Sequence, residues 1–476
     1  MENTKDKEKS FTNINLRSFI VVVCLLTGIL ILAGILTAVI PQGKYQYTAD
    51  GTIIPDTYTQ GVVQGIAFWR VLTAPFRVYV GSDALNIIMI SVFLLVMSGV
   101  FNVMEKTGGV KALIGKAMKV FSARKTLVIL IAVLGFMAFG SFFGMFEELV
   151  TLLPIVIMFT LSLGYDTMTG LGVCMLSACF GFSAAITNPF SVGLASQVAG
   201  VSVSNGVWLR LIFFVAVYAL VSAFILLYTK KIKRNIEKSL SYQIDIEKKK
   251  CIDFSGVGQE NDKVFKAYAT FFGAELVILI VIASVRAISG YAIPILAATF
   301  LIGGIGAGLI VSEDKKKVVV DFLKGAASMI PAVFMIALAS SIKLVLEEGG
   351  IIDTIMHAVI GFLSGQSKFT CILLVYLLIL ILQIFIGSAS AKIMLIMPII
   401  IPICSALGIS SATVILTYCM ADGFTDMILP TNPVLLIGLS MANVSYGKWI
   451  RFTYKLQILI FALTLAFLMF AVGINY

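Results

Sequence analysis

The chain has 476 residues, of which 59% are hydrophobic and only 13% are charged. Soluble globular proteins are about half apolar and about one-quarter charged, so this composition excludes an ordinary soluble domain and indicates an integral membrane protein. The net charge of +10 does not indicate nucleic-acid binding, because the basic residues gather between apolar runs, as the positive-inside rule predicts for cytoplasmic loops. These clusters are Lys116–Lys125, Lys230–Arg234, Lys248–Lys250 and Lys315–Lys317.

The apolar runs, taken in chain order, predict an all-α membrane protein with a cytoplasmic N-terminus. A charged tail, residues 1–17, precedes a first run that is longer than the apolar part of a signal peptide, so we expect this run to be retained. Each run has about the 20 residues that a helix needs to cross roughly 30 Å of lipid. The runs are Ser18–Ile40, Ala84–Met104, Trp208–Tyr228, Ala267–Val285, Ala326–Leu346 and Ile450–Val472.

Polar residues 229–263 predict a cytoplasmic linker between two membrane repeats, residues 18–228 and 264–476. The tripeptide Thr187-Asn188-Pro189 recurs as Thr431-Asn432-Pro433, and the offset of about 244 residues also joins Pro154 to Pro398 and Gly164 to Gly408. Each repeat contains two apolar segments joined by a short polar turn, which we interpret as a re-entrant hairpin, followed by a long segment with a break. The hairpins are expected at about 127–164 and 370–407, and the broken helices at about 168–203 and 412–443.

The positions of the basic clusters predict that the two repeats are inverted. Lys315–Lys317 place the start of Ala326–Leu346 inside, whereas the corresponding run Ala84–Met104 starts outside. Inverted repeats with interrupted helices are typical of secondary transporters, whose substrate and ion sites lie at the interruptions. The sequence therefore predicts a transporter and not an enzyme.

The two Thr-Asn-Pro tripeptides are candidates for the substrate site. Proline breaks a helix, and unpaired backbone groups at membrane depth are tolerated only where they line a protein-enclosed site. A simple proline kink is the alternative for each occurrence. Because the break occurs at equivalent positions in both halves, we favour substrate-binding roles for Thr187, Asn188, Pro189, Thr431, Asn432 and Pro433.

The predicted hairpin tips carry charged residues of opposite sign. Glu147 and Glu148 lie at the first tip, and Ser388, Ser390 and Lys392 lie at the second, with Lys392 at the same offset from Glu148. Ionisable residues in membrane spans are costly and are usually functional. Carboxylates at one tip and an ammonium at the other would suit a zwitterion, and the alternative is a structural Glu148–Lys392 salt bridge.

Two further acids precede the second break. Asp422 and Asp426 are four residues apart and so share a helix face. They are candidates for binding a coupling cation or for a proton relay, and a wet structural position is an equal alternative.

Other polar residues have plainer interpretations. We expect Trp208, Arg210, Trp449 and Arg451, which start the last run of each half, to anchor these helices at the lipid headgroups. Seven scattered cysteines and a single histidine, His357, indicate no metal site. No phosphate-binding Walker loop occurs, so we expect no cofactor other than Na+ or H+ as a coupling ion.

Four stretches carry a likeness to a known family: Gly144-Met145-Phe146-Glu147-Glu148; Leu163-Gly164-Tyr165-Asp166; Gly181-Phe182-Ser183 leading to Asn188-Pro189-Phe190; and Asp422-Gly423-Phe424 leading to Pro430-Thr431. With them the chain resembles the YfcC-like proteins, which belong with the C4-dicarboxylate anaerobic carriers (DcuC type) and the arginine/ornithine antiporters (ArcD type). The resemblance implies an ion-transporter-superfamily fold, an elevator-like displacement of the substrate, a homodimer and a location in the bacterial plasma membrane.

We therefore expect a secondary transporter of small charged organic solutes. An antiporter or ion-coupled carrier of a basic amino acid, such as arginine or ornithine, is favoured because two glutamates point to the site. The alternative is a Na+- or H+-coupled C4-dicarboxylate transporter. The lipid bilayer and the small-molecule substrate are the only other partners expected.

Overall fold

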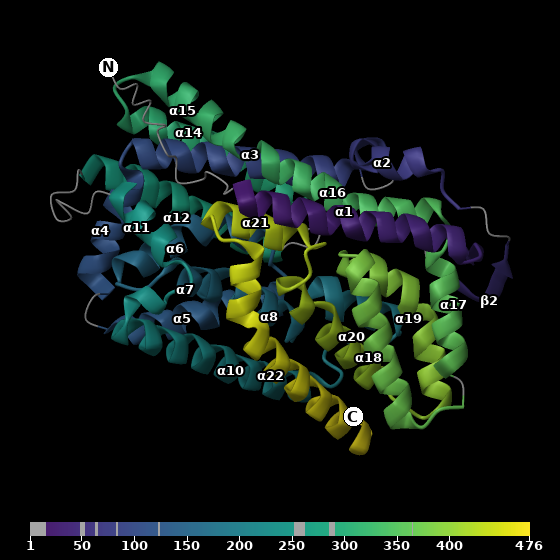
Figure 1. The fold of residues 1–476 in the computed structure, drawn as a ribbon. Helices are drawn as coiled ribbons and strands as arrows, with labels where there is room; N and C mark the ends of the chain where they lie inside the picture. Colours follow the sequence, from purple (N-terminus) through teal and green to yellow (C-terminus); the bar gives the residue numbers. More distant parts are fainter. Residues whose placement is uncertain are drawn as a thin grey trace.

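The computed structural model describes residues 16–47, 53–61, 65–81, 84–121, 124–251, 262–284, 291–363 and 365–476 (Figure 1). Helices dominate this part of the chain, and ten of them are long and apolar enough to cross a membrane. The predicted runs correspond to helices, and one further apolar helix, Ala292–Val311, was not among them. The chain is therefore a multi-pass helical membrane protein.

The elements up to the end of the first predicted repeat are α1 (Leu16–Val39), β1 (Gly43–Tyr47), β2 (Ile53–Gln60), α2 (Phe68–Arg77), η1 (Val78–Val80), α3 (Ala84–Lys106), α4 (Gly109–Phe121), α5 (Lys125–Ala138), η3 (Phe139–Phe143), η4 (Glu148–Leu152), α6 (Leu153–Ser162), α7 (Thr167–Leu171), η5 (Gly172–Leu176), α8 (Ser177–Ser183), η6 (Pro189–Gly193), α9 (Leu194–Val198) and α10 (Val207–Arg234).

The remaining elements are η7 (Ile236–Lys238), α11 (Tyr242–Cys251), α12 (Asp262–Ser284), α14 (Ala292–Val311), α15 (Lys315–Ser328), α16 (Ile330–Glu348), α17 (Ile352–Leu363), α18 (Lys368–Phe385), α19 (Ala389–Ala406), α20 (Ser411–Asp422), η8 (Phe424–Met427), α21 (Pro433–Ala442) and α22 (Tyr446–Gly473).

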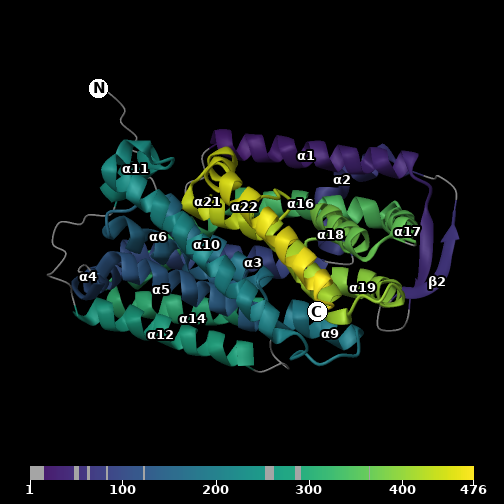
Figure 2. The ribbon, with the colours of Figure 1, turned by 90° about the horizontal axis from the view of Figure 1, so that it is seen from below.

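Helices from the beginning and the middle of the chain form one side of the molecule. Figure 1 shows α1, α3, α14, α15 and α16 along one side, with α10 and α22 on the opposite side, and Figure 2 shows α10 and α22 crossing the face seen from below. Small residues permit this packing, because a Cβ on Gly325 would lie 2.6 Å from the Asn102 side chain. Side chains also connect the helices: Ser98 Oγ donates to the Gly325 carbonyl (2.8 Å) and Asn102 Nδ2 to the Asp321 carbonyl (2.6 Å).

The fold has one β element that the all-α prediction missed. Strands β1 and β2 form an antiparallel hairpin and pack against α17 and α19. The Tyr58 ring stacks on His357 with a centroid distance of 3.8 Å, and the Tyr45 hydroxyl lies 3.2 Å from Nδ1 of the same imidazole. His357 is exposed and forms this contact with the hairpin.

The predicted linker contains a helix that packs closely on the membrane segments. Asp245 of α11 accepts hydrogen bonds from the Thr167 hydroxyl (2.5 Å) and from Ser241 (2.7 Å). Lys248 of the same helix donates to the Ala442 carbonyl (2.7 Å). Because Thr167 begins one broken segment and Ala442 ends the other, α11 joins the two halves of the chain.

Candidate functional site

The first predicted hairpin tip is bound directly to the first Thr-Asn-Pro break. The arms are α5 with η3 and η4 with α6, and the Lys125 ammonium closes the base by donating to the Leu163 carbonyl (2.7 Å). At the tip, the Ser141 carbonyl accepts hydrogen bonds from the backbone N–H groups of Ile186 (3.1 Å), Thr187 (3.2 Å) and Asn188 (3.0 Å). The freed amides of the broken segment are therefore satisfied by the tip.

Asn188 and Gly144 fit closely against each other at this junction. Asn188 is fully buried, and its Oδ1 caps η6 by accepting from the Phe190 N–H (2.9 Å). Gly144 has φ +71°, and a Cβ on it would lie 2.2 Å from that same Oδ1. Only glycine fits both the backbone conformation and the space. Thr187 is exposed and donates to the Phe142 carbonyl (3.0 Å), whereas Pro189 begins η6 and is half-buried.

The second predicted tip lies between α18 and α19. Ser388 is exposed and caps α19 by accepting from the Ala391 N–H (3.4 Å). The Tyr418 hydroxyl of α20 donates to the Ala389 carbonyl (2.6 Å), so the broken segment of this half also holds its tip. Ser390 Oγ lies 3.5 Å from the Phe190 carbonyl, which joins this tip to the first break.

Lys392 forms an ion pair with Asp422 at the base of this tip. The side chains are 0% and 2% exposed, so both charges are removed from solvent. The sequence offset had placed Lys392 opposite Glu148, but its ionic partner is Asp422. Of these three candidate residues, the structure brings two into contact.

Asp426 extends the charged cluster toward the second break. It is buried, its carboxylate accepts a hydrogen bond from Gln383 Nε2, and it interacts electrostatically with Lys392. Asn432 lies within hydrogen-bonding reach of Asp426 and caps α21 by accepting from the Val434 N–H (2.8 Å). Thr431 and Pro433 beside it are half-buried.

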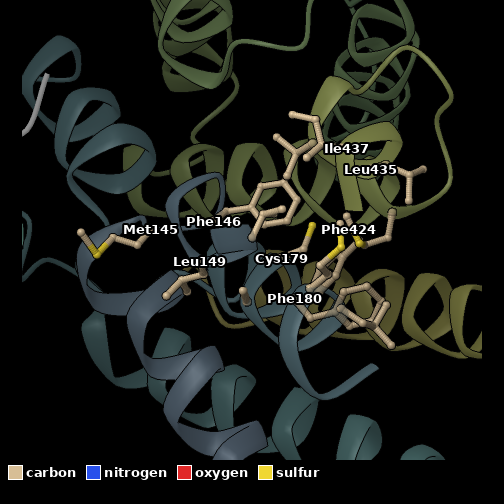
Figure 3. Close-up of a cluster of buried hydrophobic side chains, with 14 of the residues drawn as sticks. Met145, Phe146, Leu149, Cys179, Phe180, Phe424, Leu435 and Ile437 are labelled. Atoms are coloured by element: carbon tan, nitrogen blue, oxygen red, sulfur yellow. The ribbon is translucent and has the colours of Figure 1, made fainter. Parts of the chain in front are cut away.

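The two broken segments contact each other beside this cluster. The Cys179 thiol of α8 donates to the Gly423 carbonyl (3.1 Å), and the rings of Phe180 and Phe424 meet edge to face at 5.0 Å. Figure 3 shows these side chains together in an apolar cluster that also includes Phe146 from the first tip. Of the polar residues at the breaks, the two asparagines, Asn188 and Asn432, are buried beside this contact.

Glu147 and Glu148 occupy different environments at the first tip. Glu147 is exposed, whereas Glu148 is 8% exposed and begins η4, which contacts α14 and α21. Backbone N–H groups of Phe146 and Glu148 lie within hydrogen-bonding reach of the Glu148 carboxylate. Among the described residues, neither glutamate forms an ion pair with Lys392.

The expected interfacial anchors of the last helices are partly wrong. Trp449 is fully buried and donates from Nε1 to the Met427 carbonyl (2.6 Å), and Arg210 is 3% exposed and donates to the Val203 carbonyl. Arg210 therefore stabilises the end of the first broken segment, and Trp449 stabilises the part of the second that precedes its break, both from inside the protein. Trp208 and Arg451 are exposed, as an anchor must be.

Three residues of the site were missed by the sequence analysis: Ser141, Gln383 and Tyr418. Gln383 is a lone amide in the apolar run of α18, and such a residue is a signal that could have been used. The roles of Ser141 and Tyr418 depend on which backbone groups lie opposite them, and only the folded chain shows this.

Comparison with known proteins establishes the family. The sequence model of the family described as "DcuC: C4-dicarboxylate anaerobic carrier" matches residues 17–473. The chain belongs to this family. It is a membrane transporter and not an enzyme, and the resemblance inferred from the sequence motifs is confirmed.

Individual relatives of this DcuC-family chain are more distant. The chain is 25% identical over 477 residues to the putative basic amino acid antiporter YfcC of Escherichia coli, with 91% of this chain and 92% of the relative covered. It is 27% identical over 372 residues to an uncharacterized protein of Haemophilus influenzae, with 76% and 71% covered.

Two solved transporter structures are also similar. The YdaH transporter of Alcanivorax borkumensis has a TM-score of 0.45 and 17% identity, with 96% of this chain and 99% of that chain covered. MtrF of Neisseria gonorrhoeae has a TM-score of 0.43 and 16% identity, with 94% of each chain covered.

Proposed function

We propose that the protein is a secondary active antiporter or ion-coupled carrier of small charged organic solutes, with a basic amino acid such as arginine or ornithine as the substrate. The buried cluster of Lys392, Asp422 and Asp426 at the junction of the two breaks carries this proposal. The cluster contains two carboxylates and one ammonium, so it has an excess of negative charge that suits a guanidinium or ammonium group of the substrate. The name of the Escherichia coli relative agrees with this choice.

Residues around this cluster would complete the substrate site. The hydroxyl and amide groups of Thr187, Asn188, Thr431 and Asn432, the prolines that open the two breaks, and Ser388 and Ser390 at the second tip would hydrogen-bond or enclose the solute. Glu147, which is exposed, would attract its cationic group, with Glu148 behind it. Asp422 and Asp426 are the candidates for a coupling ion, Na+ or H+.

The alternative is a C4-dicarboxylate carrier, which the description of the family favours. In this case Lys392 would bind a substrate carboxylate. Its ammonium would first have to leave Asp422, because it is 0% exposed in the ion pair.

The proposed architecture is a pair of inverted repeats that move the solute by an elevator-like displacement. Matched local structures at an offset of 244 residues support the repeat. Asp166 and Ser410 cap α7 and α20 by accepting from the N–H group three residues on (2.8 and 3.1 Å). Asn188 and Asn432 both cap the helix after the break, and Gly164 and Gly408 both have positive φ, +88° and +71°.

Membrane placement and assembly remain part of the proposal. The hairpins at about 127–164 and 370–407 would be re-entrant, and residues 1–17 and the linker would be cytoplasmic, in the plasma membrane of a bacterium. A homodimer is the proposed assembly, by analogy with the transporters that the sequence resembles.

Counterflow in proteoliposomes tests the substrate. Liposomes loaded with arginine, ornithine or lysine should accumulate labelled arginine, with succinate and fumarate as the competing class and with Na+ either present or replaced by choline. Accumulation of succinate without that of arginine would overturn the basic-amino-acid proposal in favour of the dicarboxylate alternative.

Neutral variants test the site. Glu147→Gln, Glu148→Gln and Asp426→Asn should each reduce arginine counterflow while the protein still elutes as a single species. Glu275→Gln is the matched control, because Glu275 is a buried membrane acid (2% exposed) that accepts from Thr299 (3.0 Å), away from the cluster. Unchanged counterflow in all three site variants would contradict the assignment.

A further inference from the structure

The ammonium of Lys392 occupies a position where a bound cation would be expected. It is fully buried, and its partner Asp422 is 2% exposed. Lys392 is the ion-pair partner of Asp422, and the Tyr418 hydroxyl, which donates to the Ala389 carbonyl (2.6 Å), also lies within hydrogen-bonding reach of this carboxylate. Lys392 is therefore the counter-charge of this carboxylate.

Other acceptors around the ion pair lack donors. Gln383 is 2% exposed and donates from Nε2 to Asp426, but no donor among the described residues reaches its Oε1. The buried hydroxyl group of Ser183 likewise has no hydrogen-bond partner within the part of the chain that the structure describes. Unfilled acceptors beside two carboxylates suit a ligand that is rich in N–H donors, such as a guanidinium or a primary ammonium.

This arrangement exists in only one half of the chain. At the offset of 244 residues, Ala178 corresponds to Asp422, Phe182 to Asp426 and Phe139 to Gln383. The first half is apolar at these positions, so no carboxylate there needs a counter-charge. The two carboxylates and the lysine that compensates them occur together in the second half.

We propose that Lys392 is a tethered cation, which a transported ammonium or guanidinium group displaces from Asp422. When the solute leaves, the lysine returns, so a charged Asp422 is always compensated. A buried carboxylate without a counter-charge is strongly unfavourable, so the returning lysine stabilises the solute-free carrier and allows it to reorient without a bound cation. This inference rests on the proposed function and names the group that would compensate Asp422 when no solute is bound.

Chemical rescue of a lysine-deleted variant tests the proposal without transport. Lys392→Ala removes three carbons and an ammonium, which together correspond to n-propylammonium. In thermal unfolding of the purified protein in detergent, n-propylammonium chloride should stabilise this variant at concentrations at least about tenfold lower than it requires with the wild type. NaCl and choline chloride at equal ionic strength separate binding of a small cation from a general salt effect.

The double variant Lys392→Ala/Asp422→Ala is the control, because it lacks both charges and should show no gain from the cation. Should Lys392→Ala be recovered only as aggregate, purification in n-propylammonium should restore a single species. Failure to do so, while the double variant folds, would overturn the proposal. Equal cation responses of wild type, Lys392→Ala and the double variant would also overturn it.

The two proposals fail separately. Selective stabilisation of Lys392→Ala by n-propylammonium, together with absent arginine counterflow, would support the tethered cation and reject the basic amino acid as the solute. Arginine counterflow without selective stabilisation would support the transport function and reject the role of Lys392.

Discussion

The docking of α11 on the membrane segments should be weakest near neutral pH and should strengthen on either side. Asp245 and Lys248 are each 5% exposed in this contact. Burial raises the pKa of the Asp245 carboxyl from 3.8 to about 6, and burial lowers the pKa of the Lys248 ammonium from 10.5 to about 8. At pH 7 both groups are therefore charged in the docked helix, although burial disfavours the charged form of each.

The direction of each pH effect on docking follows from the protonation state that the docked helix favours. The docked pKa of Asp245 is raised, so its contribution is complete below about pH 4 and is lost as the pH rises through about 6. The docked pKa of Lys248 is lowered, so its contribution is complete above about pH 10.5 and is lost as the pH falls through about 8. One pKa unit corresponds to about 1.4 kcal/mol. Moving from pH 7 to pH 5, or from pH 7 to pH 9, therefore stabilises docking by about 1.4 kcal/mol, or about tenfold.

Hydrogen–deuterium exchange of the peptide that contains residues 242–251 measures this equilibrium. After correction for the intrinsic exchange rate, its protection should be lowest at pH 7 and about tenfold higher at pH 5 and pH 9. Asp245→Asn keeps an acceptor for Thr167 and should abolish the rise in protection between pH 7 and pH 5. Lys248→Met should abolish the rise in protection between pH 7 and pH 9. Protection that falls between pH 7 and pH 5, or a gain in protection at pH 5 that persists in Asp245→Asn, would refute the proposed role of Asp245.

Further predictions concern the tips and the ion pair. Gly144→Ala should abolish transport and lower the free energy of unfolding by at least about 1–2 kcal/mol, because φ is +71° and the new Cβ would overlap Asn188. Gly135→Ala is the control and should transport normally, because Gly135 is helical and nothing lies within 4 Å of the new Cβ. Lys392→Met and Asp422→Asn should each lower stability by about 3–5 kcal/mol in reversible unfolding, and the double variant should lose much less than the sum; additive losses would show that the two charges do not depend on each other.

The helical framework could be predicted because its signals are local. A run of about 20 apolar residues predicts a span wherever it occurs, and proline or glycine marks where a helix ends. Thus the run Ser18–Ile40 corresponds to α1 (Leu16–Val39), and the second predicted tip, around Ser388 and Ser390, coincides with the junction between the end of α18 at Phe385 and the start of α19 at Ala389. The β-hairpin was missed because its stabilising contacts, such as Tyr58 on His357, come from residues about 300 positions away.

The partners of the charged residues could not be predicted in the same way. The sequence offset relates Lys392 to Glu148, but residues at equivalent positions of two repeats need not be in contact with each other. Tertiary packing brings the end of α20 to the start of α19, and so Asp422 reaches the ammonium. The prediction for Trp449 failed for the same reason. An aromatic residue at the start of a span is typical of the membrane interface, but this indole is buried and donates to the Met427 carbonyl.

The helix ends give an independent reason to regard the Lys392–Asp422 pair as functional. Lys392 lies in the first turn of α19, and Asp422 is the last residue of α20. The helix macrodipole disfavours a cation at an N-terminus and an anion at a C-terminus, so each charge is at the less favourable end of its own helix. Neutral residues at both positions would avoid this cost and that of desolvation. Local stability therefore does not explain the pair, whereas a displaceable cation should be held mainly by opposing charge, which Asp422 and Asp426 supply here.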